Sequence, residues 1–184
     1  MMKWSLIALA LTLSACSSTP ETHYYQLPTV AEHTIVSLQP HTRPVWVEHV
    51  TVSDYLAGNG VVYQSNDVQY VIASSNVWGS PLDQQLQQTL VSNLSAELPG
   101  AIVSSTPVNE PQDIVNVTIT GFHGRYDGQV VISGTWLLQR DEQRYKRAFT
   151  LLLPQSEDGY DSLVRTLAQG WQQISTQIAN VIIQ

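Results

Sequence analysis

The apolar residues of this chain fall into two stripes with helical spacing. Between residues 81 and 98 a leucine recurs every four positions, so these side chains share one face of a helix. The Pro99-Gly100 pair ends that helix. A second apolar stripe predicts a C-terminal helix over residues 159–182, and its members are Leu163, Leu167, Trp171, Ile174, Ile178 and Val181.

The start of the first helix carries signals of its own. Ser80 can cap the helix, Pro81 suits the first helical position and Leu82 opens the apolar stripe. We expect Trp78 to pack in front of the helix in a structural role. The polar face of the helix is either solvated or used for self-association, and it carries Gln84, Gln85, Gln87 and Gln88.

Alternating and β-branched runs predict eight strand segments. The Asp127-Gly128 pair is typical of a tight turn and predicts a hairpin between two of them. Four strands, a helix, four strands and a helix follow one another, which favours two helices packed on one sheet. We therefore predict a single α+β domain with a mostly antiparallel, mixed sheet of about six to eight strands. The segments are 23–28, 45–52, 61–64, 68–73, 101–105, 112–123, 130–139 and 145–153.

The first sixteen residues predict export and lipidation. Lys3 precedes an apolar run of about ten residues, which is too short to span a bilayer because spanning takes about 20. Leu13-Ser14-Ala15-Cys16 then matches the bacterial lipobox, in which small residues precede a cysteine that is diacylated. The alternative is an ordinary secretory signal with a chance cysteine. We expect a signal peptide over 1–15, an acylated Cys16 with its tether over 16–22, and the folded domain over 23–184.

The residue after the cysteine bears on localisation. In enteric-type bacteria an Asp at that position tends to retain a lipoprotein in the inner membrane. Ser17 therefore favours the outer membrane, with the domain facing the periplasm. Two or three acyl chains at Cys16 would anchor the protein stably, whereas a single chain anchors marginally.

Charge and cysteine content exclude several classes of function. The chain has 8 Lys and Arg against 15 Asp and Glu, a formal net charge of -7, so it lacks the basic surface that nucleic acid requires. With 1 Cys it forms no internal disulfide, and a Cys-ligated zinc or iron–sulfur site is not expected. Its 43% hydrophobic residues suffice for a folded core.

No catalytic motif stands out in the sequence. The histidines form no His-Glu-x-x-His pattern and no pair four residues apart, and no Gly-x-Ser-x-Gly turn or phosphate-binding lysine loop is present. We therefore predict a non-catalytic protein without a metal or cofactor. The histidines are His23, His33, His41, His49 and His123.

The loop at residues 53–60 is the unusual local feature. It places Tyr55 and Leu56 next to a turn that contains Gly58 and Asn59. Exposed apolar groups on a loop often mark a contact, so this loop is a candidate site for a partner or lipid. The alternative is an ordinary hairpin loop with one side chain tucked beneath it.

Several segments together resemble the ABC-type transport auxiliary lipoprotein family. The likeness runs from Cys16 to the final helix, and departs only in the loop at 29–43 and in the final turn. Besides the lipobox, it rests on Tyr24-Tyr25-Gln26-Leu27-Pro28, Val50-Thr51-Val52-Ser53-Asp54-Tyr55-Leu56, Val61-Val62-Tyr63-Gln64, the Trp78-x-x-Pro81-Leu82 element and Arg125-Tyr126-Asp127-Gly128.

The resemblance implies a role rather than a reaction. Lipoproteins of this kind work with an MCE-domain protein that builds a phospholipid tunnel across the periplasm. The resemblance implies that this chain docks the tunnel at the outer membrane, contacts outer-membrane lipid and forms a homo-oligomeric ring. The alternative is an envelope scaffold or binding lipoprotein that takes no part in lipid transfer.

Overall fold

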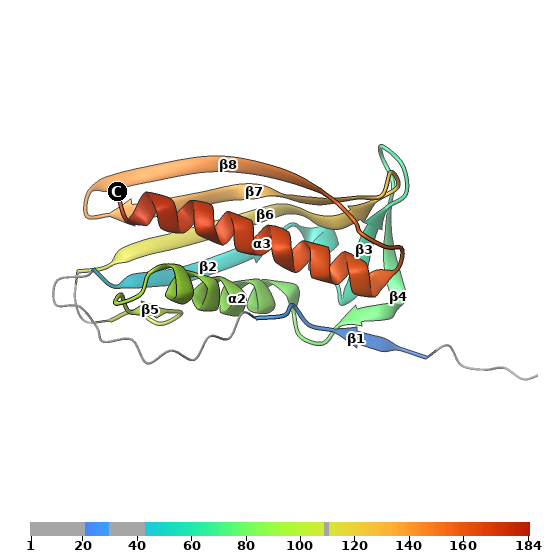
Figure 1. Cartoon of the computed structure of the whole chain (residues 1–184), viewed down its shortest axis with the longest axis horizontal. Helices are drawn as coiled ribbons and strands as arrows, with labels where there is room; N and C mark the ends of the chain where they lie inside the picture. Colours follow the sequence, from blue (N-terminus) through green and yellow to red (C-terminus); the bar gives the residue numbers. More distant parts are fainter. Residues whose placement is uncertain (1–20, 30–42, 109–110) are drawn as a thin grey trace, which may run out of the picture.

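One mixed sheet of eight strands and two α-helices make up the structure, a computed structural model that describes residues 21–29, 43–108 and 111–184 (Figure 1). The predicted α+β class and single domain are confirmed. The elements are β1 (His23–Tyr25), β2 (Val45–Val52), the 3-10 turn η1 (Asp54–Leu56), β3 (Gly60–Gln64), β4 (Tyr70–Trp78), α2 (Leu82–Glu97), β5 (Val103–Ser104), β6 (Asp113–Arg125), β7 (Gln129–Arg140), β8 (Gln143–Pro154) and α3 (Tyr160–Ile182).

Strand β6 organises the sheet. Strand β7 pairs antiparallel along one edge of β6, and β8 continues the sheet beyond β7. On the other edge, β2 pairs with the first part of β6 up to Ile119, and β3 pairs with its last residues, Gly124 and Arg125. Strands β2 and β3 therefore lie end to end, and the 53–59 loop joins them. The register of β6 against β7 shifts at this point, between Ile119 and Gly121.

Strand β4 pairs with β3, β1 pairs with β4, and β5 pairs with β2, which gives the strand order β1-β4-β3-β6-β2-β5, with β7 and β8 branching from β6. The longest pairings, β6–β7 and β7–β8, are antiparallel, as is β3–β4. The other four are parallel. Parallel pairing requires a crossover between the strands, and the chain from β3 to β5, including α2, supplies the crossover from β2 to β6.

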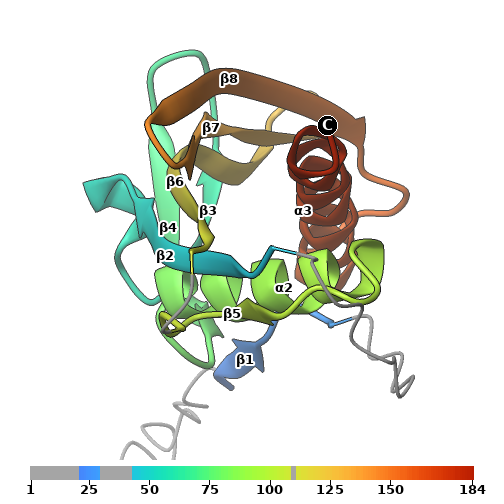
Figure 2. The ribbon, with the colours of Figure 1, turned by 90° about the vertical axis from the view of Figure 1, so that its left-hand side faces the viewer.

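Both helices cover the same, concave face of the sheet (Figure 2). The apolar stripe of α3 packs on inward residues of β6 and β7 such as Val117 and Ile132. The indole Nε1 of Trp171 on α3 donates to the carbonyl of Leu86 on α2 at 3.2 Å. Burying this one face gives the domain its core, which both helices and the sheet share.

The predicted helices over 81–98 and 159–182 are confirmed as α2 and α3. The strand expected over 68–73 is longer and reaches Trp78, because β1 pairs with its last three residues and Gly60 pairs with Val77. The cap expected from Ser80 is wrong: α2 has Pro81 at its N-cap position and no side-chain capping hydrogen bond.

The proposed lipidation site Cys16, the signal peptide and Ser17 lie outside the described residues, as do His33 and His41. Within the described segments, no helix has the length and apolar character needed to cross a membrane.

Candidate functional site

The loop that joins β2 to β3 folds into one turn of 3-10 helix. The amide of Leu56 donates to the carbonyl of Ser53 at 2.8 Å, and the amide of Ala57 donates to that of Asp54 at 3.1 Å. Such a turn directs neighbouring side chains to different sides, because each residue rotates the chain by about a third of a circle. Tyr55 and Leu56 therefore have separate environments.

Leu56 is fully buried in the core. The exposed position that we expected for it is wrong, because the 3-10 turn points this side chain under the loop rather than outward. The alternative reading, one side chain tucked beneath the loop, describes Leu56. The remaining candidates for a contact are Tyr55, which is half-buried, and the exposed residues Gly58 and Asn59.

Tyr55 lies against the outer, helix-free side of the sheet. Its hydroxyl donates to the carbonyl of Thr120 at 2.7 Å. Its ring centroid lies 4.7 Å from that of Tyr70 on β4 and 6.3 Å from that of His123 on β6. Burial, followed by the neighbouring Tyr70 hydroxyl, raises the pKa of Tyr55 to about 12. The phenol therefore stays neutral and keeps its hydrogen bond at any physiological pH.

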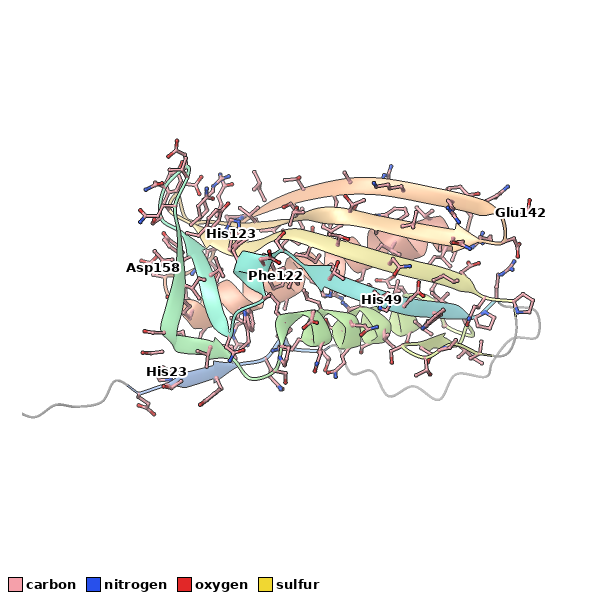
Figure 3. The ribbon with its side chains drawn as sticks, turned by 180° about the vertical axis from the view of Figure 1, so that it is seen from behind. His23, His49, Phe122, His123, Glu142 and Asp158 are labelled. Atoms are coloured by element: carbon pink, nitrogen blue, oxygen red, sulfur yellow. The ribbon has the colours of Figure 1, made fainter. Side chains whose placement is uncertain are left out.

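His123, which is labelled in Figure 3, is the third ring of this group. Its side chain is buried, and the ring of Tyr70 stands edge-on to it at 5.1 Å. The Nδ1 atom lies 3.1 Å from the carbonyl of Gly124. Burial lowers the pKa of His123, and the positive charge of Arg125 lowers it further, while the Gly124 hydrogen bond opposes both. Burial therefore favours the neutral imidazole. The three rings Tyr55, Tyr70 and His123 are here called the aromatic cluster.

The glycines and Asn59 bring the loop close to β4. A Cβ on Gly60 would collide with the carbonyl of Ala73 and lie 2.6 Å from Ile72 Cγ2, so only glycine fits there. The carbonyl of Asn59 accepts a hydrogen bond from the amide of Trp78 at 2.6 Å. By contrast, a Cβ on Gly58 would meet nothing within 4 Å. The loop is therefore fixed against β4 at Asn59 and Gly60, whereas the space around Gly58 is open.

Two residues of the Trp78, Pro81 and Leu82 element belong to the core. Trp78 is buried, with its ring centroid 6.3 Å from that of Phe122 on β6, and Leu82 is buried at the start of α2. Pro81 is exposed at the N-cap position. Trp78 and Leu82 thus belong to the hydrophobic core, and the structural role of the element stays a prediction.

Two glutamines of α2 have structural contacts that the sequence reading did not anticipate. Gln85 is buried: its Oε1 accepts the amide of Leu27 at 2.9 Å and its Nε2 donates to the carbonyl of Ser80 at 2.8 Å. Gln87 Nε2 donates to the carbonyl of Val47 at 2.9 Å. Only Gln84 and Gln88 of the four are exposed, so a glutamine-lined self-association face is reduced to these two.

The site has the character of a contact surface. Across residues 21–29, 43–108 and 111–184, no group of three or more His, Cys, Asp or Glu side chains is placed to hold a metal ion. The aromatic cluster offers three rings, one of them a buried imidazole, and the Tyr55 hydroxyl is already hydrogen-bonded to Thr120. Tyr70 and His123 were not singled out with Tyr55 in the sequence, because 15 and 68 residues separate them from it and only β-pairing brings them together.

The chain matches the family described as "ABC-type transport auxiliary lipoprotein component" over residues 25–179. It is 53% identical over 183 residues to the intermembrane transport lipoprotein PqiC of Escherichia coli (strain K12), an alignment that covers 99% of this chain and 98% of that protein. PqiC of Shigella flexneri matches to the same extent.

Solved structures agree with the fold. A crystal structure of an uncharacterized protein is 58% identical, with a TM-score of 0.80, and covers 88% of this chain and 99% of that one. A crystal structure from Xanthomonas campestris has a TM-score of 0.62 at 14% identity and covers 85% of this chain and 92% of that one, so it is similar in fold alone.

Proposed function

Because the chain belongs to the ABC-type transport auxiliary lipoprotein family, we propose that it is the lipoprotein component of an intermembrane phospholipid transport system. The observation that carries this proposal is the 53% identity to PqiC, an intermembrane transport lipoprotein, over nearly the whole length of both chains. At that identity and coverage, the two chains share their fold. The proposal assigns a transport role and no reaction.

The proposal includes an anchor and a location. A diacylated Cys16, following a signal peptide over 1–15, holds the domain of residues 23–184 to the membrane through a short tether. Ser17, the residue after the acylated cysteine, favours the outer membrane as the membrane that holds the anchor. The lipobox of the sequence supports the anchor, and the family description names a lipoprotein.

The proposal also includes a partner. A PqiB-like MCE-domain protein forms the periplasmic tunnel, and a homo-oligomeric ring of this chain docks the end of the tunnel at the outer membrane without catalysing a reaction. The exposed part of the Tyr55 loop, with Gly58 and Asn59, is the proposed contact. An uncharged aromatic surface suits this task, because a lipid path must exclude water and each exposed methylene costs about 0.8 kcal/mol.

The test is capture of the partner. The tagged, acylated protein is isolated from detergent-extracted envelopes, and the proteins bound to it are identified by mass spectrometry. We expect an MCE-domain protein in stoichiometric amount, and the mass of the purified lipoprotein should be that of a closed ring. Recovery of only peptidoglycan-linked or unrelated envelope proteins would contradict the transport role and favour an envelope scaffold.

A further inference from the structure

The first described strand places one end of the domain close to the proposed anchor. Strand β1 begins at His23, only seven residues after Cys16. Seven Cα–Cα steps reach at most about 25 Å. In Figure 1, β1 enters at the right-hand end of the long axis, and the turns between β3 and β4 and between β6 and β7 lie at the same end. We call this the tether end.

Most of the exposed large apolar side chains belong to the tether end. Val68 is 82% exposed at the β3–β4 turn, Tyr24 is 74% exposed on β1, and Tyr126 is 54% exposed at the β6–β7 turn. Three further residues on β4 are also exposed: Tyr70, Val71 and Ile72. Exposed apolar groups gathered at one end of a soluble domain usually indicate a contact surface.

The exposed apolar residues are spread over the tether end and do not share one pocket. They come from β1, the β3–β4 turn and the β6–β7 turn (Figure 1). Tyr24 lines a hollow beside α3, Tyr126 lines a separate one, and Val68 lines neither of these two. A bilayer surface can contact several separate protrusions at once, whereas a protein partner must have a surface that is complementary in shape to them. Tyrosine also favours the interface between hydrocarbon and water, where its ring is apolar and its hydroxyl is hydrated.

The charges at the tether end indicate the kind of lipid surface. Acidic residues lie in all three connections at this end. Asp67 precedes Val68 in the β3–β4 turn, and Glu157 and Asp158 come just before α3. Asp127 in the β6–β7 turn is paired with Arg125, with Arg125 Nη2 2.6 Å from Asp127 Oδ2. No basic cluster accompanies them among the described residues of this end. Strongly anionic headgroups would repel this surface, so a zwitterionic one suits it.

We propose that the tether end rests on the membrane, with Val68 and Tyr126 in the headgroup region of a zwitterionic lipid surface. This contact rests on the proposed anchor at Cys16 and adds a second attachment to it. The long axis of the domain would then point away from the bilayer, and the opposite end, where Glu142 and Ile183 lie, would face the periplasm (Figures 1 and 3).

The experiment uses a single fluorescent label. Val68→Cys and Ile183→Cys are made in the acylated protein, because the chain has only 1 Cys and acylation blocks its thiol. Val68 is 82% and Ile183 is 70% exposed, so neither label disturbs the core. Each labelled protein is reconstituted into phosphatidylcholine vesicles that carry a quencher on the lipid headgroup. We expect strong quenching and a blue-shifted emission at position 68, and neither effect at position 183.

Three outcomes would overturn the proposal. Equal, weak quenching at both positions would show that the tether end is free of the membrane. Shielding of position 68 from a water-soluble quencher only after an MCE-domain protein is added would make these residues a protein interface. Labelling of the parent protein at Cys16 would mean that the anchor is absent. By contrast, failure to capture an MCE-domain protein would contradict the proposed function while leaving the membrane contact intact.

The charge argument has a separate test. Replacing phosphatidylcholine with phosphatidylglycerol is expected to weaken quenching at position 68, and lowering the salt concentration should enlarge this loss. Asp67→Asn in the Val68→Cys protein should restore part of the quenching. Stronger quenching on the anionic vesicles would contradict the proposed zwitterionic preference.

Discussion

At the scale of single residues, two neighbours in one loop have opposite roles. Leu56 is part of the core, whereas Tyr55 stands half-buried against Tyr70 and His123 on the outer side of the sheet. A substitution at each position therefore tests a different property: stability for Leu56 and partner contact for Tyr55. A double substitution at Tyr55 and Leu56 would not separate a loss of stability from a loss of partner contact.

We expect Leu56→Ala to lower the free energy of unfolding by about 3 kcal/mol, because it removes a fully buried side chain and leaves a cavity. Urea denaturation of the purified domain measures this. Ala57→Ser, at an exposed neighbouring position, serves as the control and should change stability by no more than about 0.5 kcal/mol. A similarly small effect for Leu56→Ala would contradict the packing described for this loop.

We expect Tyr55→Ser to weaken binding of the MCE-domain partner about tenfold, the effect of losing a tyrosine at the centre of an interface. The dissociation constant measured with the purified partner tests this. Tyr145→Ser is the matched control, because Tyr145 is an exposed tyrosine on β8 outside the loop. Tyr55→Phe keeps the ring and removes only the hydrogen bond to Thr120, so it should bind almost normally.

His123 makes the stability of the domain depend on pH. Burial lowers its pKa in the folded state, so the unfolded chain takes up the proton first as the pH falls below about 6.5. Stability is therefore fully present above that pH and is lost on acidification, with a slope of at most about 1.4 kcal/mol per pH unit. Urea denaturation at several pH values should show that the free energy of unfolding falls less steeply below about pH 6.5 for His123→Gln than for the parent protein. Equal slopes for the variant and the parent would contradict a role of His123 in this pH dependence.

At the scale of elements, the contact of α3 with the sheet depends on a glycine in the middle of the helix. A Cβ on Gly170 would collide with Ile132 Cδ1 and lie 3.0 Å from Leu153 Cδ1. Helix propensity alone would favour alanine over glycine by about 1 kcal/mol. Here the close approach of the helix to β7 and β8 outweighs that preference.

We expect Gly170→Ala to destabilise the domain by about 1–3 kcal/mol, because the added methyl group overpacks the core. Ile132→Val removes the obstructing methyl group, so the double variant should be more stable than the sum of the two single changes predicts. Thermal and urea unfolding measure both. Gly58→Ala is the matched control, since a Cβ there meets nothing within 4 Å, and it should be neutral or slightly stabilising.

At the scale of the whole molecule, one buried ion pair joins the sheet to the end of the last helix. Arg140 on β7 donates to both carboxylate oxygens of Asp113 on β6, with Arg140 Nη2 2.6 Å from Asp113 Oδ2, and also donates to the carbonyl of Ile182 on α3. The Asp113 side chain is fully buried, and Arg43 Nε lies 3.2 Å from its Oδ1. The pair thus ties together three elements and the chain before β2.

We expect Arg140→Met to cost about 3–5 kcal/mol, because it leaves the buried carboxylate of Asp113 with only Arg43 as a counter-charge. Arg125→Met is the matched control. It also breaks an arginine–aspartate pair, but the Asp127 side chain is 36% exposed and solvent screens the pair, so the loss of stability should be much smaller than for Arg140→Met. Equal unfolding free energies for the two variants would show that burial of Asp113 does not matter.

Local sequence patterns are sufficient to locate both helices and the long strands of this protein. The leucine repeat of α2, the apolar stripe of α3 and the alternation of β6 and β7 are local periodicities, which depend only on neighbouring residues, and the structure has these elements where the patterns predict them. The lipobox motif and the family resemblance are likewise readable from the chain.

How the elements pack together depends on contacts between residues far apart in the chain. No local pattern specifies that β2 and β3 share one edge of β6, that both pair parallel to it, or that Tyr55 meets residues 15 and 68 positions away in the chain. The burial of Leu56 and the internal hydrogen bonds of Gln85 followed from the same long-range pairing. The burial of a side chain depends on which distant segments pack against it, and the residues next to it in the sequence do not specify those segments.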